Sequence, residues 1–519
     1  MTTPIFDLID QPWIPCVDMN GRVVELGLRD TLLQAHQLQG LGGETPLVTA
    51  ALYRLLFAVL YRAIEPPEDD QDWEKLWRVG HWDAQRISDY LERWRHRFDL
   101  FHPEHPFYQW QGRNSQTKSI NLMIFDVASG NNATLFDHHT DDEKVALTPA
   151  EAARILLVVQ AFSPAGTGGL APRDSSNAPW ASGIIFLAEG STLFDTLAFN
   201  FMPVDWWDGI PVGQEDVPVW ESDNPLLPNR NIPLGIADYL TWPNRSIRLI
   251  PEENGREFVI REAEIGSGLR LNPDVLDPFK HYRIDKRRGY IPLRFSEYRA
   301  LWRDSASLLG FQSTQTEVRA PQELDWIATL LSYHALDDLY PYRLMALGLA
   351  SNKAKIEFYR EEHMPLPASY LQDKSLVEEL EQAISLAEEV RKSLMRSISR
   401  LATLVIAPTA DEPDGRKPDK KDVNNLIAHW APERYYWAEL EPAFFVLMET
   451  LPNHPEAAMD QWIQTLLSTA EAAFARTEAS LPDDARGLRA AVRARGQLMG
   501  ALKKIRESTS QPEVTHATI

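Results

Sequence analysis

The chain has 519 residues, more than one hydrophobic core usually supports, so two or more domains are expected. Its formal net charge of -22 argues against a protein that coats nucleic acid unaided, because such binding depends on cations that neutralise phosphates. The single cysteine, Cys16, excludes an internal disulfide and a cysteine-based zinc cluster within the chain. The N-terminal segment lacks the pattern of a signal peptide, and no apolar run approaches the ~20 residues that span a bilayer. We therefore expect a soluble, cytoplasmic protein with no membrane contact.

The N-terminal region mixes strand and helix patterns. Two short apolar runs on either side of Gly21 predict a hairpin, and Pro12 and Pro15 favour an edge position for its first strand. Apolar residues at helical spacing predict a buried helix over 47–61, and a second helical stretch covers 82–94. The histidines of segment 101–109 lie beside prolines and aromatics, where capped loop histidines are commoner than metal ligands.

Three motifs of this region carry a family resemblance. They are Asp-Gln-Pro-Trp-Ile-Pro at 10–15, Gly-Glu-Thr-Pro-Leu-Val at 43–48 and His-Pro-Phe-Tyr-Gln at 105–109. In this order and spacing, together with the segments described below, they resemble CasA, the large-subunit family of the type I-E CRISPR surveillance complex Cascade. The resemblance extends over most of the chain.

The resemblance implies an α+β fold, with an irregular mixed α/β N-terminal domain and an all-α C-terminal four-helix bundle. It implies a non-enzymatic subunit that binds the protospacer-adjacent motif (PAM) of double-stranded target DNA and starts R-loop formation. The subunit would also help to recruit the Cas helicase-nuclease, as part of antiviral defence. The implied partners are CRISPR RNA, other Cascade subunits, target DNA and that helicase-nuclease, with no cofactor.

A polar loop over 131–149 carries one exposed-looking aromatic, Phe136. Its cluster 137–143, from Asp137 to Glu143, has donor atoms that suit a divalent metal, so a metal-dependent hydrolase is an alternative function. Consecutive residues cannot all converge on one ion, and no second carboxylate-histidine cluster at ligand spacing completes a site. In the resembling family this loop reaches toward the end of the CRISPR RNA, and Phe136 matches the contacting aromatic, which offers a stacking face.

A predicted helix over 150–162 leads into a loop that contains Gly166, Thr167, Gly168 and Gly169. Three glycines in four residues let a backbone approach another surface closely, as a phosphate cradle or a DNA groove requires. The loop matches neither a Walker loop nor a Rossmann fingerprint, and a mobile surface loop is the alternative. The resembling family uses a glycine loop here to contact the PAM from the minor groove.

The segment 280–290 is the densest basic stretch of this acidic chain, and it follows a hairpin pattern over 247–260. A solvated hairpin tip is the alternative interpretation of its charge. In the resembling family a lysine finger lies on the corresponding turn. Lys286 is the best match, and Arg287 is the alternative because the register is loose by one residue.

The segment 344–360 begins as an apolar run and changes to small and cationic residues, which predicts an exposed tip near a domain junction. A surface turn with solvated lysines is the alternative. In the resembling family an Asn-Gln pair on this turn wedges beneath the PAM. Asn352 matches, Lys353 stands where the glutamine would be, and Ala354 follows. A lysine stem can enter a base stack, but the replacement puts the hydrogen bonding of the wedge in doubt.

The chain beyond Pro367 is almost wholly helical in pattern. Amphipathic helices joined by short loops indicate an antiparallel bundle, and we expect these helices over 373–404, 423–430, 435–451, 456–479 and 483–506. The domains are expected over 1–365 and 366–506, with a disordered tail over 507–519. Two of the helices carry basic rows, which we interpret as solvated faces: Lys392, Arg396 and Arg400, and Arg486, Arg489 and Arg493. A protein-interaction scaffold without DNA contact is a further alternative function.

Overall fold

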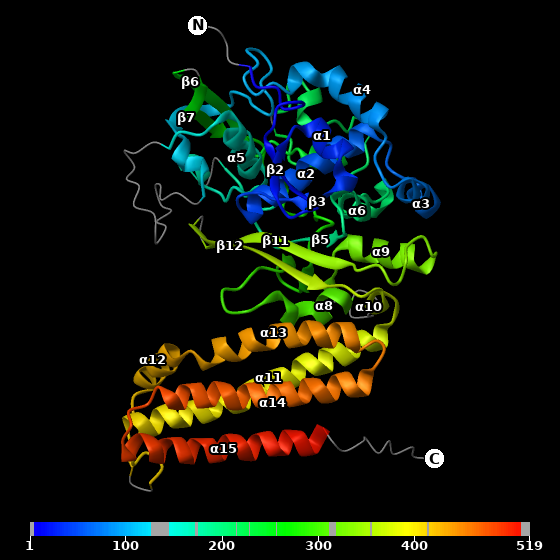
Figure 1. Cartoon of the computed structure of the whole chain (residues 1–519). Helices are drawn as coiled ribbons and strands as arrows, with labels where there is room; N and C mark the ends of the chain where they lie inside the picture. Colours follow the sequence, from blue (N-terminus) through cyan, green and yellow to red (C-terminus); the bar gives the residue numbers. More distant parts are fainter. Residues whose placement is uncertain are drawn as a thin grey trace. The chain divides into compact units, whose positions relative to one another are not determined.

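The computed structural model describes residues 5–125, 145–171, 175–213, 215–227, 229–255, 257–310, 318–352, 355–412 and 415–509 (Figure 1). The chain divides into two compact units. Unit 1 comprises Met1–Leu301 and Ser307–Gln372, and unit 2 comprises Trp302–Ala306 and Asp373–Ile519. The mixture of helix and sheet that the sequence predicts is confirmed. The sequence predicts a domain boundary after residue 365, whereas the division lies after Gln372, and no sequence pattern predicts that 302–306 belongs with the C-terminal helices.

The described strands form four antiparallel sheets of three strands, with orders β2-β1-β3, β10-β8-β9, β12-β11-β5 and β4-β7-β6. The strands are β1 (Ile14–Asp18), β2 (Val23–Leu26), β3 (Leu38–Leu41), β4 (Arg113–Ser119), β5 (Ile185–Glu189), β6 (Arg245–Asn254), β7 (Glu257–Ser267), β8 (Tyr282–Asp285), β9 (Gly289–Pro292), β10 (Val318–Arg319), β11 (Arg343–Asn352) and β12 (Lys355–Pro365). The helices up to the boundary are α1 (Leu28–Leu33), α2 (Pro46–Ala63), α3 (Asp70–Val79), α4 (Ala84–Trp94), α5 (Pro149–Phe162), α6 (Leu193–Phe199), α7 (Ile236–Leu240), α8 (Ser305–Leu309), α9 (Gln322–Ser332) and α10 (Ala368–Gln372).

The hairpins predicted about Gly21 and over 247–260 are confirmed as β1-β2 and β6-β7. The basic segment 280–290, for which a hairpin tip is one interpretation, lies on the hairpin β8-β9. The edge position predicted for the first strand is wrong, because β1 lies between β2 and β3. Pro15 is tolerated there because the pairing of β1 with β3 begins only at Cys16. Pro15 lies at the end of that ladder, where its carbonyl still accepts from Gly42 N–H at 2.9 Å, so its missing N–H group interrupts no bond within the ladder.

Helix α2 is the central helix of unit 1. Thr45 caps it by accepting a hydrogen bond from Val48 N–H, and Pro46 occupies its first turn. All of its residues from Leu47 to Tyr61 are buried, which confirms the predicted core helix. By length and composition α2 is apolar enough to cross a membrane, but 83% of the stretch is buried inside the protein, as in the core helix of a globular domain. The predicted helices at 82–94 and 150–162 are confirmed as α4 and α5.

Unit 2 consists, in its described residues, of the helices α11 (Lys374–Ile406), α12 (Lys420–Trp430), α13 (Pro432–Thr450), α14 (Pro455–Ala479) and α15 (Ala485–Thr509), together with the short segment 302–306. Helix α11 contacts each of the others and buries an apolar face at three- and four-residue spacing. The predicted basic row on α11 is not uniformly solvated, because Arg400 forms an ion pair with Asp411 at 2.6 Å.

Trp302 packs in the core of unit 2, although in the sequence it lies about 70 residues before α11, the first long helix of that unit. It is 1% exposed, and its ring centroid lies 4.4 Å from that of Phe444 and 5.6 Å from that of Trp437. The neighbouring Arg303 guanidinium lies 3.8 Å from the Trp437 ring centroid and also pairs with Glu388. Segment 302–306 is thus an integral part of the helical core.

We predict that Trp302→Ala lowers the free energy of unfolding of unit 2 by about 3–5 kcal/mol, since it leaves a large cavity among aromatic rings. Urea unfolding of the full chain, followed by far-UV circular dichroism, measures this loss. Val446→Ala on α13, where the side chain is 45% exposed, is the control and should change little. An equal effect of the two substitutions would contradict the assigned role of Trp302.

Candidate nucleic-acid interface

The glycine loop is a tight turn that ends in one turn of 3-10 helix, η4 (Thr167–Gly169). Gly166 and Gly169 have φ angles of 97° and 68°, in the left-handed region that favours glycine. Gly166 N–H donates to Ser175 Oγ at 2.8 Å, and the preceding N–H group donates to Asn177 Oδ1 at 2.9 Å. The loop is therefore tied at its neck by the side chains of the returning segment.

A lysine of strand β4, Lys118, lies beside this loop. A Cβ atom at Gly169 would lie 2.8 Å from Lys118 Nζ, so the glycine leaves room for the ammonium group. Lys118 belongs to β4, and within the described ranges its Nζ has no recorded hydrogen-bond or ion-pair partner. Only the tertiary structure brings β4 to the loop, and no pattern around 118 identifies this lysine.

The basic turn joins β8 to β9, and hydrogen bonds to the carboxylate of Asp285 hold its backbone. Asp285 Oδ1 accepts hydrogen bonds from the N–H groups of Arg287 and Arg288, both at 2.9 Å. These bonds, helped by nearby arginines, lower the pKa of Asp285. Lys286 and Arg287 are both exposed, so the structure leaves both candidates for the finger open. The turn is preset by Asp285 and displays its cations to solvent.

The base of this hairpin is fixed to the core through a buried carboxylate. Asp277 is 1% exposed, and its Oδ2 accepts hydrogen bonds from Trp180 Nε1 at 2.6 Å and from the Tyr239 hydroxyl. Its backbone N–H donates to the hydroxyl of Tyr282, the first residue of β8, at 2.9 Å. The hairpin therefore starts from a position that the core determines.

A buried lysine adds to this anchor. Lys280 is 6% exposed, and its Nζ donates to the Pro179 carbonyl at 2.7 Å. Burial lowers the pKa of Lys280 to about 8. This lysine belongs to the basic stretch of the sequence, yet it is bound inside the protein. The stretch therefore separates into a structural lysine at the base and exposed cations at the turn.

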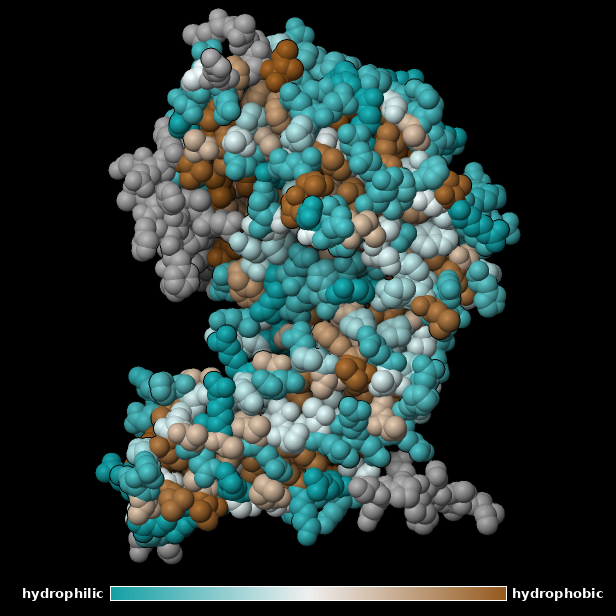
Figure 2. Space-filling model, in the orientation of Figure 1, coloured by the Kyte–Doolittle hydropathy of each residue, from teal (hydrophilic) through white to brown (hydrophobic). Residues whose placement is uncertain are grey.

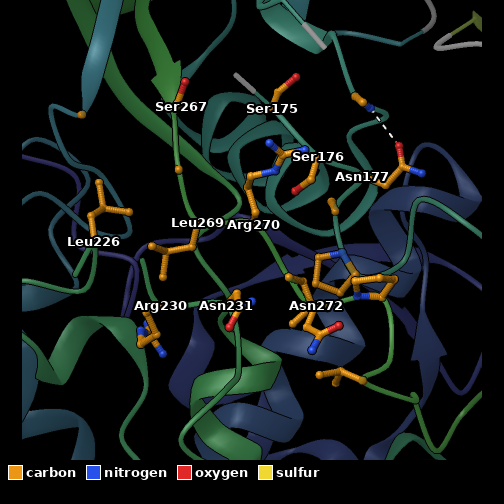
Figure 3. Close-up of a pocket in the computed structure, with 18 of the residues that line it drawn as sticks. Ser175, Ser176, Asn177, Leu226, Arg230, Asn231, Ser267, Leu269, Arg270 and Asn272 are labelled. Carbon is orange, nitrogen blue, oxygen red and sulfur yellow. Dashed lines mark hydrogen bonds between the residues drawn. The ribbon is translucent and has the colours of Figure 1, made fainter. Parts of the chain in front are cut away.

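A groove of about 1600 Å³ lies in unit 1 next to these elements (Figure 3). Figure 3 shows Ser175, Ser176 and Asn177 along one side, with Arg230 and Asn231 on the opposite side. Tyr290 and Pro292 of β9 also line the groove, as does Ala165 at the start of the glycine loop. Its lining is rich in amide and hydroxyl groups, including Gln111, Asn114, Asn224, Asn229, Ser267 and Asn272. The structure thus brings the neck of the glycine loop and the basic hairpin to one groove.

The groove presents few unpaired charges of its own. Arg230 is ion-paired with Asp238, and its guanidinium lies 4.8 Å from the Trp242 ring centroid. Burial raises the pKa of Asp238, and the ion pair with Arg230 opposes that effect. Arg230 therefore forms part of the groove wall, with its charge already paired.

The expected tip is partly outside the described residues. Asn352 ends β11 and pairs with Lys355, the first residue of β12, while Lys353 and Ala354 fall outside the described part. The small and cationic residues that follow the apolar run of segment 344–360 are expected to form an exposed tip, but the first of them, Ala350, is only 7% exposed because it lies in the strand opposite Phe358. Strand β11 also pairs with β5, so the candidate wedge extends from a three-stranded sheet. The structure does not bring the described part of this tip into the lining of the groove.

Phe136 and the acidic cluster 137–143 also lie outside the described residues. Within the residues that are described, no group of three or more His, Cys, Asp or Glu side chains is arranged to hold a metal ion. The histidines of segment 101–109 form loop contacts instead, with His102 Nδ1 accepting from His105 N–H at 3.0 Å.

Comparison with known proteins adds to this geometry. The model of the family "CRISPR-associated protein Cse1" matches residues 7–473. The chain belongs to the CRISPR-associated protein Cse1 family. It is 35% identical over 515 residues to CasA/Cse1 of Thermus thermophilus, covering 96% of this chain and 98% of that protein.

Solved structures share the fold. A crystal structure of CasA from Thermus thermophilus superposes with a TM-score of 0.76 at 30% identity, covering 96% of this chain and 100% of that one. Cse1 from Acidimicrobium ferrooxidans gives a TM-score of 0.80 at 24% identity, with 98% and 100% covered. A chain of a CRISPR RNA-guided surveillance complex gives 0.71 at 22% identity, with 96% and 100% covered. The predicted resemblance to the CasA family is confirmed.

In this Cse1-family chain, the sheet that carries Asn352 is also held by an ion-pair clamp. His363 of β12 lies between two carboxylates, with Nδ1 2.8 Å from Glu189 Oε2 and Nε2 2.8 Å from Glu361 Oε1. Burial by itself lowers the pKa of His363, but the hydrogen bonds to both carboxylates outweigh it and raise the pKa to about 9. Because Glu189 belongs to β5, the clamp spans the sheet from β12 to β5 across β11.

We predict that His363→Gln destabilises the chain at pH 6 and has much less effect at pH 10. The folded-state pKa of about 9 lies above the ordinary 6.5, so the stabilisation is complete below pH 6.5 and is lost as pH rises through 9. The measurement is the Tm difference between parent and variant at both pH values. His454→Gln, at an exposed position in unit 2, is the control. A His363→Gln difference that does not shrink with pH would rule out a charged clamp.

Proposed function

We propose that the chain is the large subunit of a type I-E CRISPR RNA-guided surveillance complex and recognises the PAM of double-stranded target DNA. Membership of the Cse1 family supports the assignment, as does the fold shared with a chain of a CRISPR RNA-guided surveillance complex. In this proposal the subunit starts R-loop formation and helps to recruit the helicase-nuclease. CRISPR RNA and the other subunits hold it in a cytoplasmic ribonucleoprotein, and unit 2 is the family's C-terminal four-helix bundle.

The observation that carries the proposal is the arrangement at the groove. The neck of the glycine loop and strands β8 and β9 of the basic hairpin line the same groove. The loop itself offers close backbone access, and the turn of the hairpin offers exposed cations. A glycine backbone enters a minor groove with little steric cost, and cations beside it neutralise phosphates. Because the minor groove distinguishes base pairs only partly, such a reader accepts several PAM sequences. Gly166 to Gly169 and Lys286 or Arg287 are the proposed contacts.

The acidity of the chain is compatible with a subunit that makes only a local contact to DNA. A net charge of -22 disfavours tight binding to DNA by the isolated subunit. In an RNA-guided complex, base pairing with the guide supplies sequence identity and much of the affinity, so the PAM reader needs only a local contact. Asn352 and Lys353 are the proposed wedge that holds the first opened base pair, and Phe136 the proposed contact to the RNA end.

The proposed subunit is not itself a nuclease. A metal-dependent hydrolase at 137–143 and a scaffold without DNA contact are the alternatives, and no described contact favours either of them. Each alternative makes a clear prediction. A hydrolase cleaves DNA when Mg²⁺ or Mn²⁺ is added. If the subunit is only a scaffold, a complex assembled without it keeps the same PAM preference.

We predict that a complex assembled with this subunit binds a PAM-containing duplex more tightly than a PAM-free duplex, and that a complex assembled without it shows no such preference. Gel shifts on the two duplexes at one salt concentration measure the difference. Incubation with Mg²⁺ and Mn²⁺ in the same samples should leave the DNA intact. Equal affinities with and without the subunit would favour the scaffold, and cleavage that is lost in Asp141→Ala/Asp142→Ala would favour the hydrolase.

We predict that Lys118→Ala weakens binding of the assembled complex to every duplex by a similar factor and leaves the PAM preference intact. A phosphate contact carries no base information, and its loss reduces the magnitude of the salt slope by about one charge. Titrations at several salt concentrations measure the slope, and Lys118→Arg should restore it. Lys75→Ala is the matched control, since Lys75 is exposed and paired with Asp72 on α3. A Lys118→Ala slope equal to that of the control would exclude the phosphate contact.

A further inference from the structure

Helix α15 is strongly basic although the chain is acidic. It contains seven basic residues and one acidic residue, Glu507, in a chain of net charge -22. Its buried face is made of small and aliphatic residues that pack toward α11. The basic residues all lie on the exposed face. The charge of α15 therefore points away from the core of unit 2.

Internal contacts explain only part of this charge. Arg486 donates to the carbonyls of Val405 and Ile406 at the C-terminal end of α11, at 2.7 and 2.8 Å. Arg489, by contrast, lies near the N-terminal end of α15, where the helix dipole disfavours a cation. Among the described contacts it donates only to a carbonyl of its own helix, and Arg493 has no recorded partner. These two arginines are available to a partner outside the chain.

An apolar row runs beside the basic one. Leu488, Val492 and Met499 are 64%, 63% and 45% exposed, and their spacing of four and seven residues places them on one face. Apolar side chains, brown in Figure 2, come to the surface of unit 2 among hydrophilic ones. Next to Met499 a groove of about 260 Å³ lies between α14 and α15, lined by Phe474, Leu498 and other residues. The exposed face thus offers both apolar surface and a groove that can hold a partner's side chain.

Two glycines lie between these rows. Gly496 and Gly500 are one helical turn apart, and a Cβ atom at either position meets no atom within 4 Å. Glycine in the middle of an exposed helix lowers its stability, so these positions do not serve the helix itself. Small residues one turn apart let a second helix approach the backbone closely.

We propose that this face of α15 docks an acidic amphipathic helix of a partner protein. The partner's apolar side chains would cover Leu488, Val492 and the groove beside Met499, and its carboxylates would pair with Arg489 and Arg493. Nucleic acid explains the face less well, because α15 contains no aromatic side chain for base stacking and an exposed aliphatic row adds nothing to phosphate binding. The identity of the partner, a protein subunit of the RNA-guided complex, rests on the proposed function.

The test titrates labelled full-length chain with the RNA-bearing core complex that lacks it, and separately with single-stranded and PAM-free duplex DNA. Three variants probe the face: Gly496→Leu, Arg489→Glu/Arg493→Glu, and Leu488→Gln/Val492→Gln. Leucine, glutamate and glutamine all favour helix, and acids near a helix N-terminus are favourable, so each variant should fold. We expect each to raise the Kd for the core complex at least ~10-fold and to leave DNA binding unchanged.

Matched controls use the same chemistry on other helices of unit 2. Lys392→Glu/Arg396→Glu on α11 and Val446→Gln on α13 alter exposed side chains and should dock like the parent. Docking unchanged in all three α15 variants would overturn the proposal. The proposal would also be overturned if Arg489→Glu/Arg493→Glu lost DNA binding while Gly496→Leu docked normally. That combination indicates a surface that binds nucleic acid. Failure of the parent chain itself to join the core complex would instead overturn the proposed function, and with it the partner named here.

Discussion

The buried carboxylate of Asp277 holds together the segments of unit 1 from which the candidate interface extends. A carboxylate removed from water must be hydrogen-bonded, and Asp277 accepts from Trp180, Tyr239 and the N–H of Phe279. These donors come from the segment after the glycine loop, from α7, and from the turn before β8. The neck of the loop and the base of the basic hairpin therefore share one anchor. Loss of this carboxylate would leave several buried donors without an acceptor at once.

The charges of the chain are separated by location. Lys118 and the turn cations Lys286 and Arg287 lie in a chain of net charge -22, so the long-range field opposes DNA while the local field favours phosphate. At physiological salt the distant acids are screened beyond about 8 Å, and the local cations decide what happens at the groove. A subunit of this kind contributes a short-range contact within an assembly and gains little from binding DNA alone.

Much of the fold was predictable from local patterns. Helices with strong periodicity, such as α2 and α11, and hairpins with clear turn residues, such as β6-β7, were found because local burial and turn chemistry agree. Helix α3 was missed because its sequence, rich in charged residues, buries only Trp73. The edge prediction for β1 failed because a proline disfavours a central strand only where the neighbouring ladder needs its N–H.

The sequence by itself determined the strongly periodic helices, the family and the short motifs, because periodicity, glycine spacing and clustered cations are properties of neighbouring residues. It also supplied the glycine loop and the basic turn as separate candidates. Only the tertiary structure decided that the neck of the glycine loop and the strands of the basic hairpin line one groove, that Lys280 is buried while Lys286 is exposed, and that Lys118 lies beside Gly169. These outcomes depend on strand pairing and on burial between segments far apart in the chain, which local pattern does not encode.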